Sequence, residues 1–178
     1  MEPDLLDQLS GIVFLRAKNE AETIYANIQG GPNLLAWFGH IPDFHDAEIV
    51  SFGLRRRAPS MLVIHAWNKT NEADARGHRI LDRHAIVTFA LEDIVDLQLN
   101  GFSHQNVISG LHLRRAPARP DRRPFYGLDP SPSDYEIELE PCFGLDGMIR
   151  CRRILVDLIP GKPDDTRGWS TATRRAGE

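Results

Sequence analysis

The sequence predicts an α+β domain in which short N-terminal helices pack on an antiparallel β-meander of about six or seven strands, either a single sheet or a curled sandwich. After Pro42 the apolar residues recur with a period of two, which is typical of strands. No helical segment separates these strands, and parallel pairing would need long crossovers, so antiparallel pairing is predicted. A chain of 178 residues is long enough for one hydrophobic core.

Residues 1–41 are predicted to hold the helices. The stretch "NEAETIYANI" (19–28) has an acidic start and the apolar spacing of a short helix. Its apolar residues share one side: Ile24, Tyr25 and Ile28. The stretch "GGPNLLAWFG" (30–39) begins with a breaker pair and ends in glycine, which predicts a helix of about one to two turns. Its apolar residues are expected to dock on the core: Leu34, Leu35, Trp37 and Phe38.

Residues 42–160 are predicted to form the sheet. The strand segments are 46–54, 60–67, 85–91, 95–99, 106–113, 134–140 and 147–160. In the fourth of them apolar residues alternate with Asp96, Gln98 and Asn100, which predicts a sheet that is wet on one side. The last segment keeps its apolar residues on one face only if a bulge or kink lies near Arg152 and Arg153.

Residues 1–160 are therefore predicted to be one domain, followed by a polar tail at 161–178. Cys142 and Cys151 cannot form a disulfide framework, so two free thiols in a reduced, cytoplasmic setting are expected. No apolar run reaches the roughly 20 residues needed to cross a bilayer, and the acidic N-terminal stretch is not typical of a secretory signal. We expect no contact with a membrane.

The net charge of −4 argues against a general nucleic-acid binder, which needs a cationic surface. The exception is the stretch 114–123, which carries five arginines. Its prolines and its lack of apolar periodicity predict a solvated loop. A site for RNA or lipid phosphate is the alternative that this stretch leaves open.

The stretch "HIPDFHDAEIVSFGL" brings His45, Asp46 and Glu48 together, which are residue types that bind metals or transfer protons. On a strand, Asp46 and Glu48 would share a face and His45 would point to the opposite one, which makes a poor chelate. If the strand begins later, residues 43–47 form a turn in which Asp43 or Asp46 caps backbone amides. We favour this structural junction, assign no metal ligand and no catalytic residue, and expect His45→Ala or Asp46→Ala to cost about 1–3 kcal/mol.

A second polar stretch, "NGFSHQNVISGL", follows the fourth predicted strand. Its hydrogen-bonding side chains are Ser103, His104, Gln105 and Asn106. They could form a recognition loop, or place His104 beside His45. We favour the interpretation that they satisfy backbone groups where two strands connect. His65, inside the second predicted strand, is interpreted as a hydrogen-bonded sheet histidine.

No motif in the sequence indicates a reaction or a cofactor. No serine stands in a Gly-x-Ser-x-Gly elbow, and "FGLDG" at 143–147 is more typical of a hairpin turn than of a phosphate-binding loop. Neither cysteine has a histidine neighbour in the sequence, so a thiol enzyme is not indicated.

Two short motifs resemble those of small bacterial proteins grouped with or near immunity protein family fifty, over about residues 34–160. The first, typically "G…PSFHDAEV", is matched here by Pro42, Phe44, His45, Asp46, Ala47, Glu48 and Val50. Asp43 stands where serine is common in that family. The second, "DLEL.GF.HQN", is matched by Gly101, Phe102, His104, Gln105 and Asn106.

The resemblance implies a cytoplasmic, non-enzymatic protein that neutralises a cognate toxin by occlusion, with no cofactor and no catalytic residue. Such proteins present acidic or aromatic residues to the basic cleft of the toxin. Two alternatives remain open. One is a metal-dependent or acid–base enzyme that uses His45, Asp46 and Glu48, with or without His104. The other is a structural module that associates with itself through an edge strand.

Overall fold

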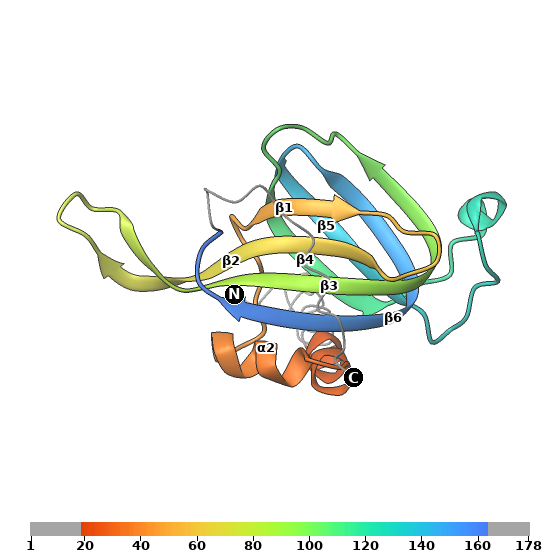
Figure 1. Cartoon of the computed structure of the whole chain (residues 1–178), viewed down its shortest axis with the longest axis horizontal. Coiled ribbons are helices and arrows are strands. Elements are labelled where there is room, and N and C mark those ends of the chain that lie inside the picture. Colours follow the sequence, from red (N-terminus) through yellow and green to blue (C-terminus); the bar gives the residue numbers. More distant parts are fainter. Residues whose placement is uncertain (1–18, 164–178) are drawn as a thin grey trace, which may run out of the picture.

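The strands close into a barrel (Figure 1). The structure, a computed structural model, describes residues 19–163. Its strands are β1 (Glu48–Gly53), β2 (Ser60–Ala73), β3 (Arg79–Asn100), β4 (Val107–Arg115), β5 (Tyr135–Phe143) and β6 (Asp146–Pro160). All neighbours are antiparallel, in the order β1-β2-β3-β6-β5-β4, and the pairing of Glu48 with Val107 closes the barrel. The predicted α+β class is confirmed, with an antiparallel sheet and short helices.

The order of the strands departs from the predicted simple meander. β1, β2 and β3 follow one another, and so do β4, β5 and β6, but β3 pairs with β6 rather than with β4. The last strand, β6, has β3 on one side and, for its first half, β5 on the other. Beside its second half, the Val156 amide donates to the Gln29 carbonyl at 2.8 Å. Closure leaves few open edges for self-association through the barrel wall.

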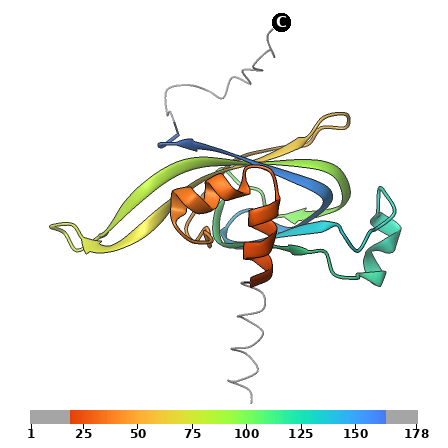
Figure 2. The same ribbon diagram turned by 90° about the horizontal axis from the view of Figure 1, so that it is seen from below.

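Two helices lie on the β6 side of the barrel, and α2 contacts that strand (Figure 2). Residues 19–27 are helical, and α2 (Gly31–Phe38) follows after Gly30 and ends where the Gly39 amide donates to the Leu35 carbonyl. Gly30 touches the barrel so closely that a Cβ atom there would lie 1.7 Å from the Val156 carbonyl oxygen. Only glycine fits that position, which also has a φ of 80°. The two predicted helices are therefore present, and they cover one side of the barrel.

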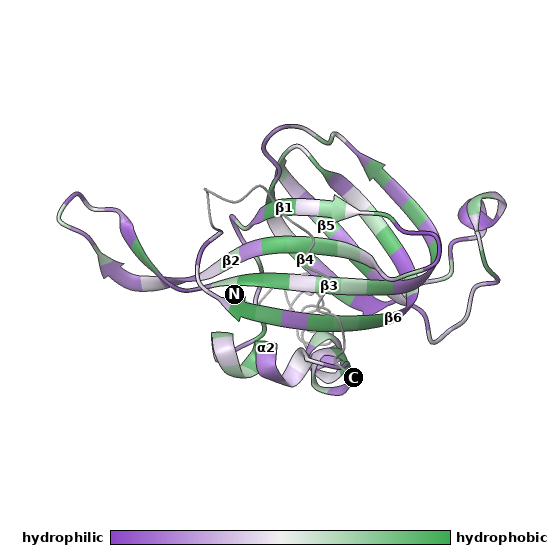
Figure 3. Cartoon of the chain, viewed as in Figure 1, coloured by the Kyte–Doolittle hydropathy of each residue, from purple (hydrophilic) through white to green (hydrophobic). Residues whose placement is uncertain are grey.

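Alternating apolar residues fill the barrel and meet the helices in a single core (Figure 3). The largest fully buried side chains come from both parts: Tyr25, Leu34, Leu62, Ile64, Phe89, Leu91, Ile108, Ile137 and Ile149. Cys142 is exposed and Cys151 is buried, and both are free thiols, as predicted. The predicted tail lies mostly outside the described residues, as does its Trp169.

The third and fourth predicted strands are one strand, β3, which bends at two bulges. The pairing register shifts between Ala66 and Asn68 of β2, opposite Arg83, and again between Ile94 and Asp96 of β3 itself. Arg83 and Asp93 take positive φ angles of 48° and 54° at these points. A β-bulge bends its strand and re-aims the residues beyond it, so β3 changes direction twice without ending.

The predicted change of phase in β6 is confirmed. Arg152 and Arg153 are both exposed, whereas Cys151 before them and Ile154 after them are buried. The extra residue lies on the opposite strand, between Ile94 and Asp96 of β3, close to Asp93 with its positive φ angle.

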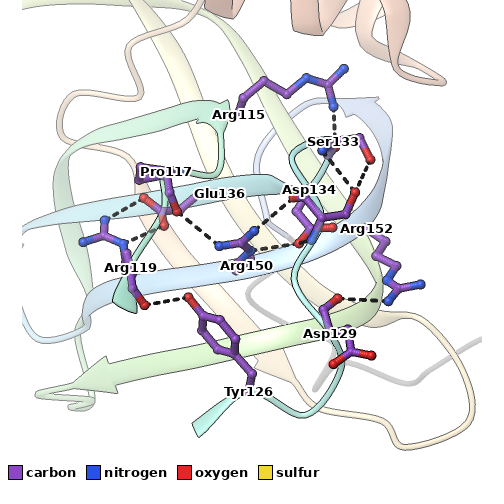
Figure 4. A network of polar contacts seen from close by, with 11 residues as sticks. Arg115, Pro117, Arg119, Tyr126, Asp129, Ser133, Asp134, Glu136, Arg150 and Arg152 are labelled. Carbon is purple, nitrogen blue, oxygen red and sulfur yellow. Dashed lines mark hydrogen bonds and ion pairs between the residues drawn. The ribbon is translucent and has the colours of Figure 1, made fainter. Parts of the chain in front are cut away.

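A row of alternating charges crosses four neighbouring strands on the outer face of the barrel. Asp96 of β3 pairs with Arg150 of β6, Arg150 with Glu136 of β5, and Glu136 with Arg114 of β4. The first three side chains of this charged row are almost fully buried. They are covered by residues 116–134, which include the short helix η1 (Pro120–Phe125) and form the arginine loop (Figures 1 and 4).

The arginine loop supplies a partner of opposite charge to each buried member of the row. The pairs are Arg122 with Asp96 (2.7 and 2.9 Å), Arg119 with Glu136 (2.8 and 3.0 Å) and Asp134 with Arg150 (2.9 Å). The solvated loop that we predicted here is therefore wrong, because Arg114, Arg119 and Arg122 are bonded to buried carboxylates. The prediction that Asp96 is wet is wrong for the same reason. These arginines are already neutralised, which weakens the case for a phosphate site.

Glu136 accepts hydrogen bonds from Arg119 and Arg114 and is fully buried. Burial alone would raise the pKa of its carboxyl, but the hydrogen bonds and charges of the two arginines outweigh burial and hold the pKa below its ordinary value. The carboxylate therefore contributes stability above the ordinary carboxyl pKa. That contribution is lost as the pH falls through the lowered pKa of the folded state.

We expect Glu136→Gln to lower the free energy of unfolding by about 3–5 kcal/mol at neutral pH, because two arginines lose their counter-charge. The control is Glu140→Gln, which removes an exposed contact with His112 and should cost less than about 1 kcal/mol. Urea denaturation of both variants measures the difference. The gap between Glu136→Gln and the wild-type protein should narrow at acidic pH, and equal losses in the two variants would contradict the assignment.

Candidate functional site

The ribbon formed by β2 and β3 continues beyond the barrel wall as an arm, residues 69–83, at the left of Figure 1. Every residue from 71 to 83 is exposed, so both faces of this ribbon meet solvent. At its tip the Asp74 carboxylate accepts hydrogen bonds from the amides of Arg76 and His78, at 2.8 and 2.9 Å, which closes the turn. Beyond its base, the arm is therefore a projection that is exposed on both faces.

The base of the arm is bonded to the end of α2. The Trp37 indole donates to the Arg83 carbonyl at 2.9 Å, and the Arg83 guanidinium donates to the Trp37 carbonyl. The Asn68 side chain donates to the Phe38 carbonyl at 3.0 Å. Together with the Arg83 bulge, these bonds fix the direction in which the arm leaves the barrel.

A cleft of about 560 Å³ lies between the arm base and the segment that joins α2 to β1. Its lining residues are Phe38, His40, Asp43, His45, Trp67, Asn68, Lys69, Thr70, Asp82 and Arg83. The first sequence motif therefore contributes Asp43 and His45 to the cleft.

His45, Asp46 and Lys69 contact one another at the rim of the cleft. The His45 Nδ1 atom is 3.1 Å from Asp46 Oδ1 and 3.1 Å from Lys69 Nζ, and Lys69 also donates to Asp46 Oδ2. The alternative in which residues 46–54 are a strand, with His45 and Asp46 on opposite faces, does not apply, because both lie in a turn before the strand. The Lys69 hydrogen bond holds the pKa of Asp46 below its ordinary value. A general acid needs the opposite shift, so Asp46 is suited to polar contact.

The turn predicted for residues 43–47 is confirmed. The Asp43 carboxylate accepts a hydrogen bond from the His45 amide at 2.9 Å, and Phe44 and Asp46 take positive φ angles of 57° and 65°. The strand begins at Glu48, and Ile49 faces the core. The alternative in which Asp46 and Glu48 share a face of one strand therefore does not apply, and a bulge between Ile49 and Ser51 changes the phase of the strand further on.

The second motif forms the loop between β3 and β4, and its hydrogen bonds satisfy backbone groups as predicted. The buried Asn106 side chain accepts from the amides of Ser103 and Leu145, at 3.0 and 3.1 Å, and donates to the Ser103 carbonyl at 2.8 Å. Its own carbonyl accepts from the Ile49 amide, which joins this loop to the first motif. His104 and Gln105 are exposed.

The structure does not assemble the predicted cluster into one centre. Of its six residues, only His45 lines the cleft, and Asp46 borders it through Lys69. Glu48 lies on β1, paired with His65 of β2 and Val107 of β4. Within residues 19–163, no group of three or more His, Cys, Asp or Glu side chains is arranged to hold a metal ion.

Sequence reasoning missed a pair of histidines on the outer face. His65 Nε2 is 3.1 Å from His84 Nδ1, their rings are stacked with centroids 5.3 Å apart, and Trp67 packs edge-on against His65. The interpretation of His65 as a hydrogen-bonded sheet histidine is confirmed. Burial, followed by the charges of His84 and Lys162, lowers the pKa of His65 to about 4. His84 could not have been found by alternation, because the Arg83 bulge sets its phase.

The loss of stability expected for His45→Ala and Asp46→Ala becomes smaller once their exposure is known. His45 and Asp46 are about half exposed, at 51% and 43%, so truncating either leaves no buried polar group unpaired. His45→Ala and Asp46→Ala should each change the free energy of unfolding by less than about 1 kcal/mol. Asn106→Ala serves as the comparison. It leaves two amides and one carbonyl without a hydrogen-bond partner and should lower the free energy of unfolding by about 1–3 kcal/mol. Thermal unfolding followed by circular dichroism measures all three, and a large loss in Asp46→Ala would overturn the assignment.

The His65 pair predicts a loss of stability in mild acid. Because the folded-state pKa of His65 is lowered to about 4, the unfolded chain takes up the proton first, and stability falls as the pH drops from about 6.5 toward 4. His65→Gln should flatten this part of the profile of melting temperature against pH. His78→Gln, at the exposed tip of the arm, is the control and should keep the wild-type profile. Identical profiles for the His65 variant and the wild-type protein would contradict the prediction.

The described helices include none that is both long and apolar enough to span a membrane. Comparison of the chain with protein-family models, with curated proteins and with solved structures gives no match. The resemblance to immunity protein family fifty therefore stays a prediction that rests on the two motifs, whose residues form the turn beside the cleft and the β3–β4 loop.

Proposed function

We propose that the chain is a non-enzymatic protein-binding protein, specifically an immunity protein that acts in the cytoplasm and neutralises a cognate toxin by occlusion. The observation that carries this proposal is the arm, which extends from a closed barrel with both faces in solvent. The resemblance of the two motifs to immunity protein family fifty supports the choice of partner.

A two-stranded ribbon on its own is marginally stable in water. This arm nevertheless exposes Ile80 and Leu81, which are 40% and 39% accessible. They are successive residues of β3, so their side chains lie on opposite faces of the ribbon. Apolar side chains on a projection supply the centre of a protein interface once a partner covers both faces of the arm.

The surroundings of these two residues suit the rim of such an interface. Glu72, Arg79 and Asp82 are exposed on the arm, and the cleft at its base carries His45 and Lys69. An apolar centre with a polar rim is the usual composition of a protein interface. The projecting arm and the adjoining cleft can together block the entrance to an active site, which requires binding and no chemistry.

The test is protection of cells from the toxin encoded beside this gene. Co-expression of the wild-type chain should rescue growth. Ile80→Asp combined with Leu81→Asp should abolish rescue and weaken toxin binding by at least about tenfold, because charges replace the apolar centre. Leu54→Asp is the control, since Leu54 is 56% exposed and lies in the β1–β2 turn at the other end of the barrel (Figure 1).

Each result has one interpretation. Rescue by the control and not by the arm variant supports both the function and the arm as its contact surface. Rescue by the arm variant would remove the arm from the interface. No rescue by the wild-type chain, together with no binding to the toxin in calorimetry, would overturn the proposed function.

A further inference from the structure

Phe102 and Phe143 are the most exposed large apolar side chains of the described residues, at 68% and 67%. Phe102 follows Gly101 at the end of β3, and Phe143 precedes Gly144 in the turn between β5 and β6. The two glycines touch, since a Cβ atom on Gly101 would lie 2.5 Å from the Gly144 carbonyl oxygen. The two rings therefore leave adjoining points of the backbone, in the loops at the top of Figure 1. We call Phe102 and Phe143 the aromatic corner.

The backbone that carries the aromatic corner is held in place from within. Asn106 bonds to Ser103 on the Phe102 side and to the Leu145 amide on the Phe143 side. Gly101 and Gly144 have φ angles of 72° and 80°, and a Cβ atom on Gly144 would lie 2.5 Å from Asn106 Oδ1. The rings are thus displayed on fixed supports, and a partner that binds them pays little to order the loops.

The carboxylates that the corner can offer a partner are those of Glu48 and Asp146, because Glu136 and Glu138 are paired with Arg114. The segments 41–49, 98–113 and 136–149 contain no lysine and no arginine. Glu48, Val107 and Phe143 stand in one row across three neighbouring strands. The backbones of Glu48 and Phe143 are therefore about 10 Å apart, and their side chains project from the same face. Asp146 follows Phe143 by three residues, and its Oδ1 atom is buried without a hydrogen-bond partner.

We infer that the aromatic corner is a docking surface for a cationic segment of a protein partner, in which apolar pockets take the two rings and lysines or arginines meet the surrounding carboxylates. Exposed aromatic anchors with a complementary charged rim are the features that give protein interfaces their affinity and selectivity. The inference rests on the proposed function only in that the partner is a protein. It adds a second contact surface and the charge of its ligand.

The probe is a phage-displayed library of random peptides, selected on the immobilised full chain. Enriched peptides should be rich in lysine or arginine and contain aliphatic or aromatic residues. Their binding should weaken as salt is added. In calorimetry, Phe102→Ser combined with Phe143→Ser should bind them at least about tenfold more weakly. Phe125→Ser is the matched control, because Phe125 is 64% exposed but lies on the arginine loop.

Folding is checked separately from binding. The phenylalanine variants should keep the wild-type melting temperature, since both rings are largely in solvent. Glu48→Lys, which leaves the rings in place, should also weaken binding of the basic peptides and gives a second readout should the double variant unfold.

Three results would overturn the inference: no enrichment, enriched peptides without basic residues, or undiminished binding to both the folded double variant and Glu48→Lys. The outcome is separable from that of the proposed function. If peptide binding requires the aromatic corner but the chain does not protect cells from the toxin, only the immunity role is refuted. If protection requires the arm but peptide binding does not depend on the aromatic corner, only the docking role of the corner is refuted.

Discussion

The length of β3 is the constraint on which the rest of the structure depends. A strand of 22 residues would be about 70 Å long if straight, whereas strands are usually about 3–10 residues, so β3 cannot lie within one small barrel wall. The bulges near Arg83 and Asp93 divide it into three parts that run in different directions. The middle part forms the wall, the first part becomes the arm, and the last part carries Gly101 and Phe102 to the opposite side. Each proposed contact surface thus includes an extension of this one strand.

The charged row secures the other side of the barrel by a different mechanism. A one-residue slip of any strand in the row would turn a charged side chain into the apolar core, which costs far more than the slip could recover. Because Asp96, Arg150 and Glu136 also need partners outside the sheet, the arginine loop must fold onto the wall for the row to be stable. Register and loop position are therefore specified by the same residues.

Much of the fold could be predicted because it is encoded locally. Alternation identified the strand segments, a breaker pair and a final glycine marked α2, and the exposed pair Arg152–Arg153 signalled the change of phase in β6. The polar turn at Asp43 and the role of Asn106 followed from how such side chains cap backbone groups. In each case the residues that decide the structure are close in sequence.

The remaining features depend on distant pairs. The closure of the barrel requires β3 to pair with β6 rather than with β4, which follows it in the sequence, and no local pattern predicts this pairing. Arg122 reaches Asp96 across 26 residues, so a stretch rich in arginine and proline was read as solvated. The arm was not predicted because the polar residues after Trp67 are typical of a loop. The stretch "LEDI" is typical of a turn, and in the structure Asp93 does adopt a positive φ, but it does so inside a continuous strand.

The two excursions from the barrel differ in how far they can be altered by protein engineering. The tip of the arm, from Asp74 to His78, is bonded mainly to itself, so new chain ends or an inserted reporter domain at Gly77 would leave every barrel pair intact. A break in the arginine loop would instead free Arg119 and Arg122 from carboxylates that stay behind in the wall. An inserted segment is therefore tolerated at the arm and disruptive at the loop.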